Sequence, residues 1–262
     1  MKVNPELVSS LKELPSNKKV YFASDFHLGI PNETESLERE QKIVRWLEHV
    51  SKDASVIFLL GDLFDFWFEY KTTIPKGFIR FQGKLAELRD RGIPIVIFTG
   101  NHDLWMFDYF PKQFGIPIYR KPIELEIRGK KFLIGHGDGL GPGDTRYKIT
   151  KSIFTNKLCQ WLFRWIHPDV GISIAKSWSR NSRIANDQFD EVFKGEKEGL
   201  WQYCKSVNEK NPHDFYVFGH RHLSLALPVS DTSTYYNLGE WVNECPYLEF
   251  DGSEAVLKTF EG

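Results

Sequence analysis

Carboxylate, imidazole and carboxamide side chains occur in this chain directly after short apolar segments. The motifs that carry them are SDFH, GDLFD, GNHD, GHGD and GHRH, and the candidate residues are Asp25, His27, Asp62, Asn101, His136, His220 and His222. None of them is a thiol, and a mixed oxygen and nitrogen set of this kind suits Mn, Fe, Zn or Co. Seven candidates exceed what one tetrahedral ion requires. The set therefore predicts a centre of two metal ions.

Asp62 is the candidate that we expect to bind both ions. It lies between the other candidates in chain order and follows a segment that is expected to be a central strand. Two ions about 3.5–4 Å apart can clamp a phosphoryl group and lower the pKa of a shared water. That water, as hydroxide, is the expected nucleophile.

The apolar runs before these motifs are rich in Val, Ile and Phe and predict buried strands. Asp25 and His27 lie two residues apart, as do His220 and His222, so each pair shares one face of an extended segment. Side chains at the ends of strands converge at one edge of an open α/β sheet. A single Gly-Asp or Gly-His pair is usually only a turn, but the five motifs together indicate one active site.

The order of the remaining segments predicts an α/β sandwich with a helical insertion. Strands are expected near residues 19–24, 55–60, 93–99, 116–119, 123–128, 131–135, 213–219, 225–228, 234–238, 246–250 and 255–259. Helices are expected at 34–51 and 77–91, and residues 1–17 form a short N-terminal extension. More than 80 residues separate His136 from His220, which is implausible for a structureless loop. We predict a core of residues 1–139 and 211–262 and a helical cap of residues 140–210 over the metal site.

The expected cap is both basic and aromatic. Between residues 140 and 185 the basic residues are Arg146, Lys148, Lys151, Lys157, Arg164, Lys176, Arg180 and Arg183, whereas the acidic ones are Asp144 and Asp169. One interpretation is that the aromatic residues bury the cap against the core. The other is that the segment meets anionic lipid headgroups or holds an anionic headgroup together with acyl chains.

Composition limits the class of protein. The 262 residues carry a net charge of −1, which gives no general signature of nucleic-acid binding. The three cysteines are far apart and form no CxxC pair, as expected of reduced thiols in the cytoplasm. The N-terminal residues lack a long apolar run, so we expect no signal peptide, and no stretch reaches 18 apolar residues. The sequence leaves the oligomeric state open.

The five motifs together resemble those of the calcineurin-like metallophosphoesterases, which have D-x-H, G-D-x-x-D, G-N-H-D/E, G-H and G-H-x-H in this order. The resemblance implies an α/β/β/α sandwich of two mixed sheets. It implies a first ion bound by Asp25, His27, Asp62 and His222 and a second bound by Asp62, Asn101, His136 and His220. His102 would then face the substrate phosphate, with Asp103 orienting it and Asp65 supporting the site through hydrogen bonds.

The segment from HGDGLGPGDTRYKITKSIF to IAKSWSRNSRIAND resembles the cap of the UDP-2,3-diacylglucosamine hydrolases of lipid A biosynthesis. The resemblance implies cleavage to UMP and 2,3-diacylglucosamine 1-phosphate (lipid X) with two divalent ions, Mn²⁺ first among them. It implies a lipid-linked nucleotide substrate and a cytoplasmic protein at the surface of the inner membrane. The implied substrate contacts are Asn101, His102, Asp144, Tyr147, Arg180, Ser182, Asn186 and His220.

The chain departs from that family at two places. Many members have Arg where this chain has His102, and Gln188-Phe189 stands where a Lys is expected. Two alternatives stay open: a phosphodiesterase or phosphatase for another substrate, and a non-catalytic scaffold. A scaffold on this fold should have lost ligands, and all seven candidates are present.

Overall fold

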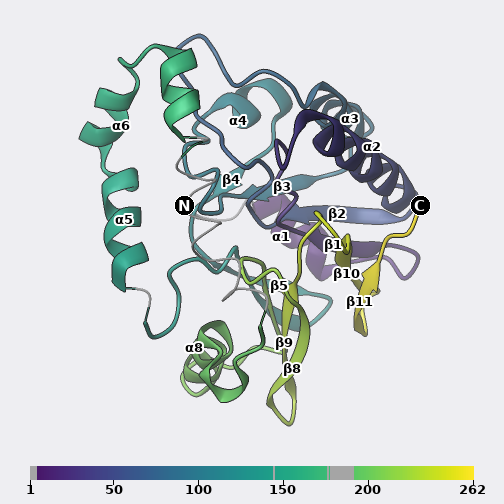
Figure 1. The fold of residues 1–262 in the computed structure, drawn as a ribbon. Helices are drawn as coiled ribbons and strands as arrows, with labels where there is room; N and C mark the ends of the chain where they lie inside the picture. The colour runs from purple at the N-terminus through teal and green to yellow at the C-terminus, as the bar shows by residue number, and fades with distance from the viewer. Residues whose placement is uncertain (1–4, 144, 176, 178–191) are drawn as a thin grey trace.

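Two stacked β-sheets form the centre of the molecule, with helices on their outer faces (Figure 1). The computed structural model describes residues 5–143, 145–175, 177 and 192–262. The strands are β1 (Lys19–Ala23), β2 (Ala54–Leu59), β3 (Ile95–Phe98), β4 (Ile118–Tyr119), β5 (Ile123–Ile127), β6 (Lys130–Ile134), β7 (Phe215–Phe218), β8 (Ser224–Ser230), β9 (Ser233–Leu238), β10 (Pro246–Phe250) and β11 (Ala255–Thr259). The helices are α1 (Pro5–Lys12), α2 (Glu33–Val50), α3 (Ile79–Asp90), α4 (Tyr109–Phe114), α5 (Thr145–Thr155), α6 (Lys157–Phe163), the 3-10 turn η1 (Gly195–Lys197) and α8 (Gly199–Asn208).

Both sheets are mixed. The six-stranded sheet has the order β11-β10-β1-β2-β3-β4, in which β1 to β4 are parallel and β10 runs antiparallel to β1. The five-stranded sheet has the order β5-β6-β7-β9-β8, in which β6, β7 and β9 are parallel. The carboxyl ends of β1, β2 and β3 therefore lie at one edge of the first sheet, and those of β6 and β7 lie together in the second. This arrangement confirms the predicted fold class.

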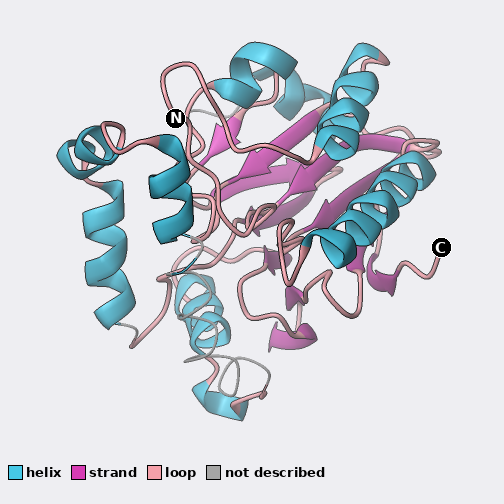
Figure 2. Cartoon of the chain, turned by 45° about the horizontal axis from the view of Figure 1, so that its top comes forward, coloured by secondary structure: helices cyan, strands magenta, loops and turns pink. Residues whose placement is uncertain are grey.

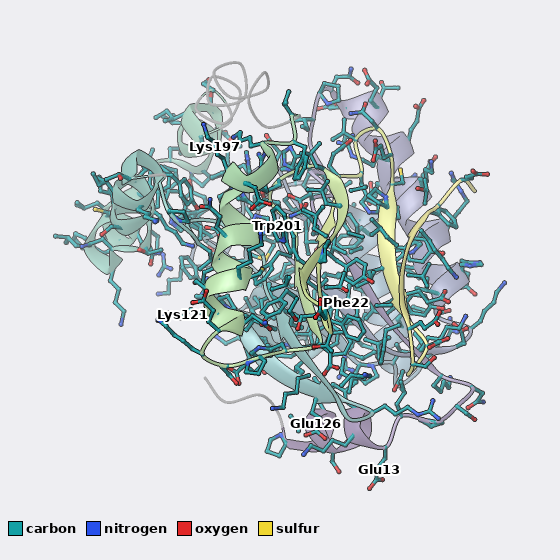
Figure 3. All side chains as sticks on the ribbon, turned by 90° about the horizontal axis from the view of Figure 1, so that it is seen from below. Glu13, Phe22, Lys121, Glu126, Lys197 and Trp201 are labelled. Carbon is teal, nitrogen blue, oxygen red and sulfur yellow. The ribbon has the colours of Figure 1, made fainter. Side chains whose placement is uncertain are left out.

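Alternation along the strands divides the core into layers. In β1, Val20 and Phe22 pack between the two sheets, whereas Tyr21 and Ala23 pack against the helices of the first sheet. Figure 3 shows Phe22 deep among the side chains of the interior. Both faces of the six-stranded sheet are covered, which explains why its parallel strands β1, β2 and β3 are apolar at nearly every position.

Helix α2 shows how sequence fixes one of the outer helices. The side chain of Asn32 caps its first turn by accepting a hydrogen bond from the backbone N–H of Glu35 at 3.0 Å. Ile43, Leu47 and Val50 recur at helical spacing and are completely buried against the sheet. The expected helix at 34–51 therefore forms within one residue of its predicted bounds.

The N-terminal residues contain a helix that the sequence did not predict. Helix α1 lies within the segment expected to be an extension, and its Leu7 and Leu11 are buried in the layer between the sheets. The backbone N–H of Arg128 donates to the carbonyl of Leu11 at 3.0 Å, which fastens the helix beside β5.

Helices α5 and α6 stand apart from the sheets, at the side of the molecule (Figures 1 and 2). Both lie within the range expected to form the cap. Helix α8 lies in the same range but covers the outer face of the second sheet, where Leu200 and Cys204 pack with Tyr216 and the indole N–H of Trp201 donates to the carbonyl of Pro228 (Figure 3). Among the described residues, none of the helices is long and apolar enough to cross a membrane.

Candidate active site

The candidate ligands converge at the edge where the two sheets meet. Asp25 and His27 follow β1, Asp62 follows β2, Asn101 follows β3, His136 follows β6, and His220 and His222 follow β7. One cluster contains Asp25, His27, Asp62 and His222, and a second contains Asp62, His136 and His220. Within each cluster the possible ligand atoms lie within 4.8 Å of one another. Asp62 belongs to both clusters, which is the position expected of a bridging carboxylate.

In the first cluster, three side chains point toward one place. The Nε2 atoms of His27 and His222 are 3.0 Å apart. The Oδ1 atom of Asp25 lies 3.5 Å from Nε2 of His222 and 3.8 Å from Nε2 of His27. Two imidazoles and a carboxylate at these separations can bind a single cation between them.

In the second cluster, a backbone contact sets the orientation of His136. Its Nδ1 lies 2.8 Å from the carbonyl oxygen of Leu60, which only accepts hydrogen bonds, so Nδ1 carries the proton. Its Nε2 then faces Oδ2 of Asp62 at 3.3 Å and Oδ1 of Asn101 at 3.2 Å. Nδ1 of His220 approaches the same Asn101 oxygen at 2.8 Å. A hydrogen bond from the distal ring nitrogen is the usual support for a metal-binding histidine.

Backbone strain is concentrated at the candidate ligands. Asp25, His27, Asp62, His220 and His222 have φ values of 55°, 45°, 51°, 73° and 52°. Non-glycine residues rarely adopt positive φ, and such strain gathers at functional sites where the surrounding structure enforces it. Here the enforcing contacts include hydrogen bonds from the N–H of Asp25 to the carbonyl of Gly61 and from the N–H of His27 to the carbonyl of Asp62, both 3.0 Å.

Gly61 allows the loops after β2 and β3 to approach each other. A Cβ atom at this position would lie 2.6 Å from the backbone nitrogen of Gly100 and 2.8 Å from Nδ1 of His136. Gly61 also has a φ of 95°. Any side chain here would push Asp62 away from His136, which explains why glycine precedes the bridging candidate.

Three candidate ligands, Asp25, His27 and Asp62, are held in the deprotonated state that binds a metal ion. Burial would raise the pKa of Asp25, but the hydrogen bond with His222 and the charge of His136 hold it below its ordinary value. The pKa of Asp62 lies well below its ordinary value for similar reasons, since His136 and His102 outweigh burial. Burial lowers the pKa of His27 to about 3, so this imidazole is neutral.

His136 behaves differently from His27. Burial opposes its protonation, yet the adjacent Asp62 carboxylate raises the pKa of His136 to about 10. A cation bound between the two side chains would replace the proton on Nε2, because metal binding and protonation compete for the same nitrogen.

The donor set fits divalent cations. Oδ2 of Asp62 is buried and has no hydrogen-bond partner among the described residues, although a buried carboxylate oxygen is costly to leave unsatisfied. This oxygen points between the clusters toward Nε2 of His136. Carboxylate, carboxamide and neutral imidazole groups around an unsatisfied oxygen are the surroundings that a bridged pair of ions would complete.

His102 lies beside the first cluster and is oriented by Asp65. Its Nδ1 is 3.0 Å from the carbonyl oxygen of Asp65 and 3.5 Å from its carboxylate, and its ring is 5.0 Å from that of His27. Asp103 accepts hydrogen bonds from the backbone N–H groups of Gly100 at 2.7 Å and Leu63 at 2.8 Å. Asp103 thus joins two ligand-bearing loops, and its expected role in orienting His102 stays a prediction.

Asp138 is a functional candidate that the sequence analysis missed. It is buried two residues after His136, and its carboxylate accepts hydrogen bonds from the hydroxyl of Tyr147 and from Nζ of Lys151, the latter at 2.6 Å. The Tyr147 ring lies 6.1 Å from that of His220. Asp138 therefore fastens α5 beside the second cluster, and its place in the GHGD motif was the available signal.

Four of the expected substrate contacts, Asp144, Arg180, Ser182 and Asn186, lie outside the described residues.

A second missed feature is a buried ion pair behind the GHRH loop. Arg221 lies between His220 and His222, and its Nε is 2.5 Å from Oε1 of Glu198, while its Nη2 is 3.3 Å from Oε2. Glu198 is 1% exposed and directly precedes α8. The pair connects the loop of two candidate ligands to the segment that leads back from the expected cap.

Comparison with known proteins places this geometry in a family. The model of the calcineurin-like phosphoesterase family matches residues 18–224. A protein of Porphyromonas gingivalis named UDP-2,3-diacylglucosamine hydrolase is 35% identical over 256 residues, which cover 93% of this chain and 98% of that protein. Proteins of the same name from Actinobacillus succinogenes and Histophilus somni are 25% and 26% identical, and the matches cover 88% of this chain and 95% and 96% of theirs. Since the matched residues include all five motifs, the chain belongs to the calcineurin-like phosphoesterase family and is a metal-dependent phosphoester hydrolase.

Proposed function

We propose that the chain hydrolyses the pyrophosphate of UDP-2,3-diacylglucosamine to UMP and lipid X in lipid A biosynthesis. The names of its relatives support this substrate, because the similarity extends over nearly the whole of both chains. The observation that carries the chemistry is the place of Asp62 in both clusters. A shared carboxylate brings two ions close enough to act on the same phosphoryl group.

The residues of the two clusters are proposed to hold two divalent ions. The first ion would be held by Asp25, His27, Asp62 and His222, and the second by Asp62, Asn101, His136 and His220. Such ions supply Lewis-acid charge to the phosphoryl group and activate water for attack. We propose Mn²⁺ as the native ion, with Fe, Zn or Co as alternatives, because the donors mix hard oxygens with imidazole nitrogens.

His102 is proposed to stabilise negative charge on the reacting phosphoryl group. Its contact with Asp65 fixes the ring at the edge of the first cluster. Attack at the uridine-side phosphorus expels a sugar phosphate, whose second pKa is about 6, so this group leaves without strong protonation. Asp103 is proposed to hold the loop that carries Asn101 and His102 through its two backbone hydrogen bonds.

The segment 140–210 is proposed to act as a cap that handles the lipid part of the substrate. Some of its aromatic residues do pack on the core: the rings of Phe154 and Phe163 lie 5.4 and 4.7 Å from that of Trp105. Others face outward, with Trp161 51% and Trp165 75% exposed. Between residues 149 and 174, Ile149, Ile153, Leu158, Leu162, Val170 and Ile174 are exposed as well.

Exposed apolar and aromatic side chains of this kind suit contact with a membrane surface. Tryptophan and aliphatic side chains enter the boundary between headgroups and acyl chains, and nearby basic residues attract anionic headgroups. Lys148, Lys157 and Arg164 supply that charge on the same segment. We therefore propose peripheral association with the cytoplasmic face of the inner membrane, where Tyr147 and the cap would receive the substrate headgroup.

The deciding experiment is phosphorus NMR of the products formed from UDP-2,3-diacylglucosamine. The chain is first stripped of metal with a chelator and then restored with Mn²⁺. Release of UMP and lipid X that depends on the ion supports the proposal. Brisk cleavage of a generic phosphodiester without turnover of this lipid would retain the metal-dependent chemistry and refute the substrate.

A further inference from the structure

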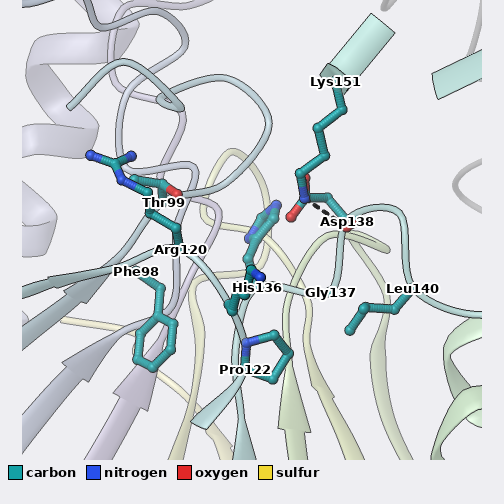
Figure 4. A pocket seen from close by; sticks show the side chains of 10 residues that line it. Phe98, Thr99, Arg120, Pro122, His136, Gly137, Asp138, Leu140 and Lys151 are labelled. Carbon is teal, nitrogen blue, oxygen red and sulfur yellow. Dashed lines mark hydrogen bonds and ion pairs between the residues drawn. The ribbon is translucent and has the colours of Figure 1, made fainter. Parts of the chain in front are cut away.

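A cavity of about 220 Å³ borders the second cluster, with His136 forming part of its wall (Figure 4). Phe98, Pro122 and Leu140 give it apolar surfaces, and Asp138 and Lys151 lie together on one side. A group bound in the cavity would therefore be adjacent to a phosphoryl group at the candidate metal centre. None of the proposed metal-ligand roles accounts for this space.

The size of the cavity limits what it can hold. Sites for drug-sized ligands measure about 300–1,000 Å³. At about 220 Å³ the cavity is smaller, so it suits a single ring system and excludes two acyl chains. The large exposed apolar surface lies elsewhere, on α5, α6 and the residues that follow them.

The polar groups of the cavity suit an uncharged ring rather than a second phosphate. The guanidinium of Arg120 donates to the backbone carbonyls of Leu104 and Met106, and it points away from His136 (Figure 4). Lys151 is already neutralised by Asp138 at 2.6 Å. Lys121 also lines the cavity, and it is exposed to solvent. The interior of the cavity therefore offers a bound group hydrogen-bonding partners and little unpaired positive charge from these three side chains.

Thr99 supplies an unused hydrogen-bonding group. It lines the cavity, is 3% exposed, and its hydroxyl has no partner among the residues that the structure describes. A hydroxyl both donates and accepts, and leaving one buried without a partner is unfavourable. A ligand with a carbonyl or ring N–H would satisfy it.

From these observations we propose that the cavity binds the nucleobase end of the substrate, a pyrimidine with carbonyl and N–H groups on its edge. The inference rests on the proposed function, which supplies a uridine nucleotide. The cavity would hold the base on the side of His136 while the acyl chains extend along the exposed face of the cap. Thr99 and the Asp138–Lys151 pair would thus contribute to selection of the nucleotide.

The test measures UMP binding by calorimetry with the full chain loaded with Mn²⁺. Thr99→Val removes the hydroxyl at nearly constant volume, and Leu140→Trp fills the cavity with a larger side chain. We expect Thr99→Val to weaken UMP binding roughly 3- to 10-fold, the effect of one hydrogen bond, and Leu140→Trp to weaken it more than about 10-fold. Thr99→Ser keeps the hydroxyl and should bind UMP like the unchanged chain.

Inorganic phosphate and lipid X are the control ligands, because neither carries a base. Their binding should be the same in all variants if the cavity holds the base. Equal loss of phosphate and UMP binding, or loss of lipid X binding alone, would overturn the inference. Bound metal is measured for each variant. If Thr99→Val binds less metal, the UMP affinity of Leu140→Trp tests the inference in its place. Failure of the unchanged chain to hydrolyse UDP-2,3-diacylglucosamine would instead refute the proposed function itself.

Discussion

Replacing Arg221 with methionine is expected to destabilise the protein and to weaken the metal centre. The substitution leaves the carboxylate of Glu198 buried at 1% exposure without its ion-pair partner. Removing one partner of a buried pair costs about 3–5 kcal/mol, because the remaining charge stays desolvated. The double variant Arg221→Met with Glu198→Leu removes both charges, so it should recover most of that loss.

The free energy of unfolding is measured by urea denaturation of the full chain in the presence of chelator. The matched control is Glu196→Gln, which breaks the ion pair with Lys205 in the same region. That pair is 3.0 Å long, but its side chains are 80% and 36% exposed, so the change should stay below about 1 kcal/mol. A loss in Arg221→Met no larger than the control, or additive losses in the double variant, would contradict the energetic argument.

A second readout separates positioning from general stability. Arg221 lies between His220 and His222, so the single variant should bind Mn²⁺ about 10- to 100-fold more weakly, as for other residues that support metal ligands. The titration is done at low urea, where the variant is fully folded. Unchanged metal affinity together with reduced stability would show that the pair does not position these histidines.

Four further outcomes are expected. Asp62→Asn should bind less metal, and its kcat/KM should fall on the order of 10³-fold, because the bridging carboxylate contributes several kcal/mol through both ions. If the variant still binds two ions per chain, Asp62 is not the bridging ligand. His102→Ala should reduce the reaction rate more for a substrate with an alkoxide leaving group than for a pyrophosphate, toward the upper end of about 10²–10⁴-fold. Equal rate reductions for both substrates would exclude charge stabilisation as the main role of His102. Burial lowers the pKa of His213 below 6.5, so the unfolded chain binds more protons than the native chain, and the free energy of unfolding falls as the pH falls below about 6.5. His213→Gln should reduce the difference between the free energies of unfolding measured in urea at pH 7.5 and at pH 5.5. An unchanged difference would count against this role of His213. The side chain of Trp165 is 75% exposed, and Trp165→Ala should weaken binding to anionic vesicles by roughly 1–3 kcal/mol. The control is Ile79→Ala on α3, where the side chain is 76% exposed and the change should leave vesicle binding unaltered. Equal effects of the two variants would argue against membrane binding through the cap.

The main strands and the two long helices were predictable because their signals are local. β1, β2 and β3 form within one or two residues of their predicted bounds, and α2 ends where its apolar spacing ends. The short helices α1 and α4 escaped prediction, since packing stabilises them more than their own periodicity does. Leu7 and Leu11 hold α1 in place through contacts with a layer assembled from distant strands.

The amino-acid sequence by itself determined the chemistry of the site: which residue types occur, that each follows a strand, and that glycine precedes most of them. These are properties of short segments, and strand ends at one edge of a sheet must meet. Tertiary structure alone decided which partner each supporting group contacts. The contact of His102 with Asp65, the pairing of Arg221 with Glu198 and the cavity beside Thr99 each join segments far apart in the chain. Such pairings depend on the order and packing of the strands, which local periodicity does not encode.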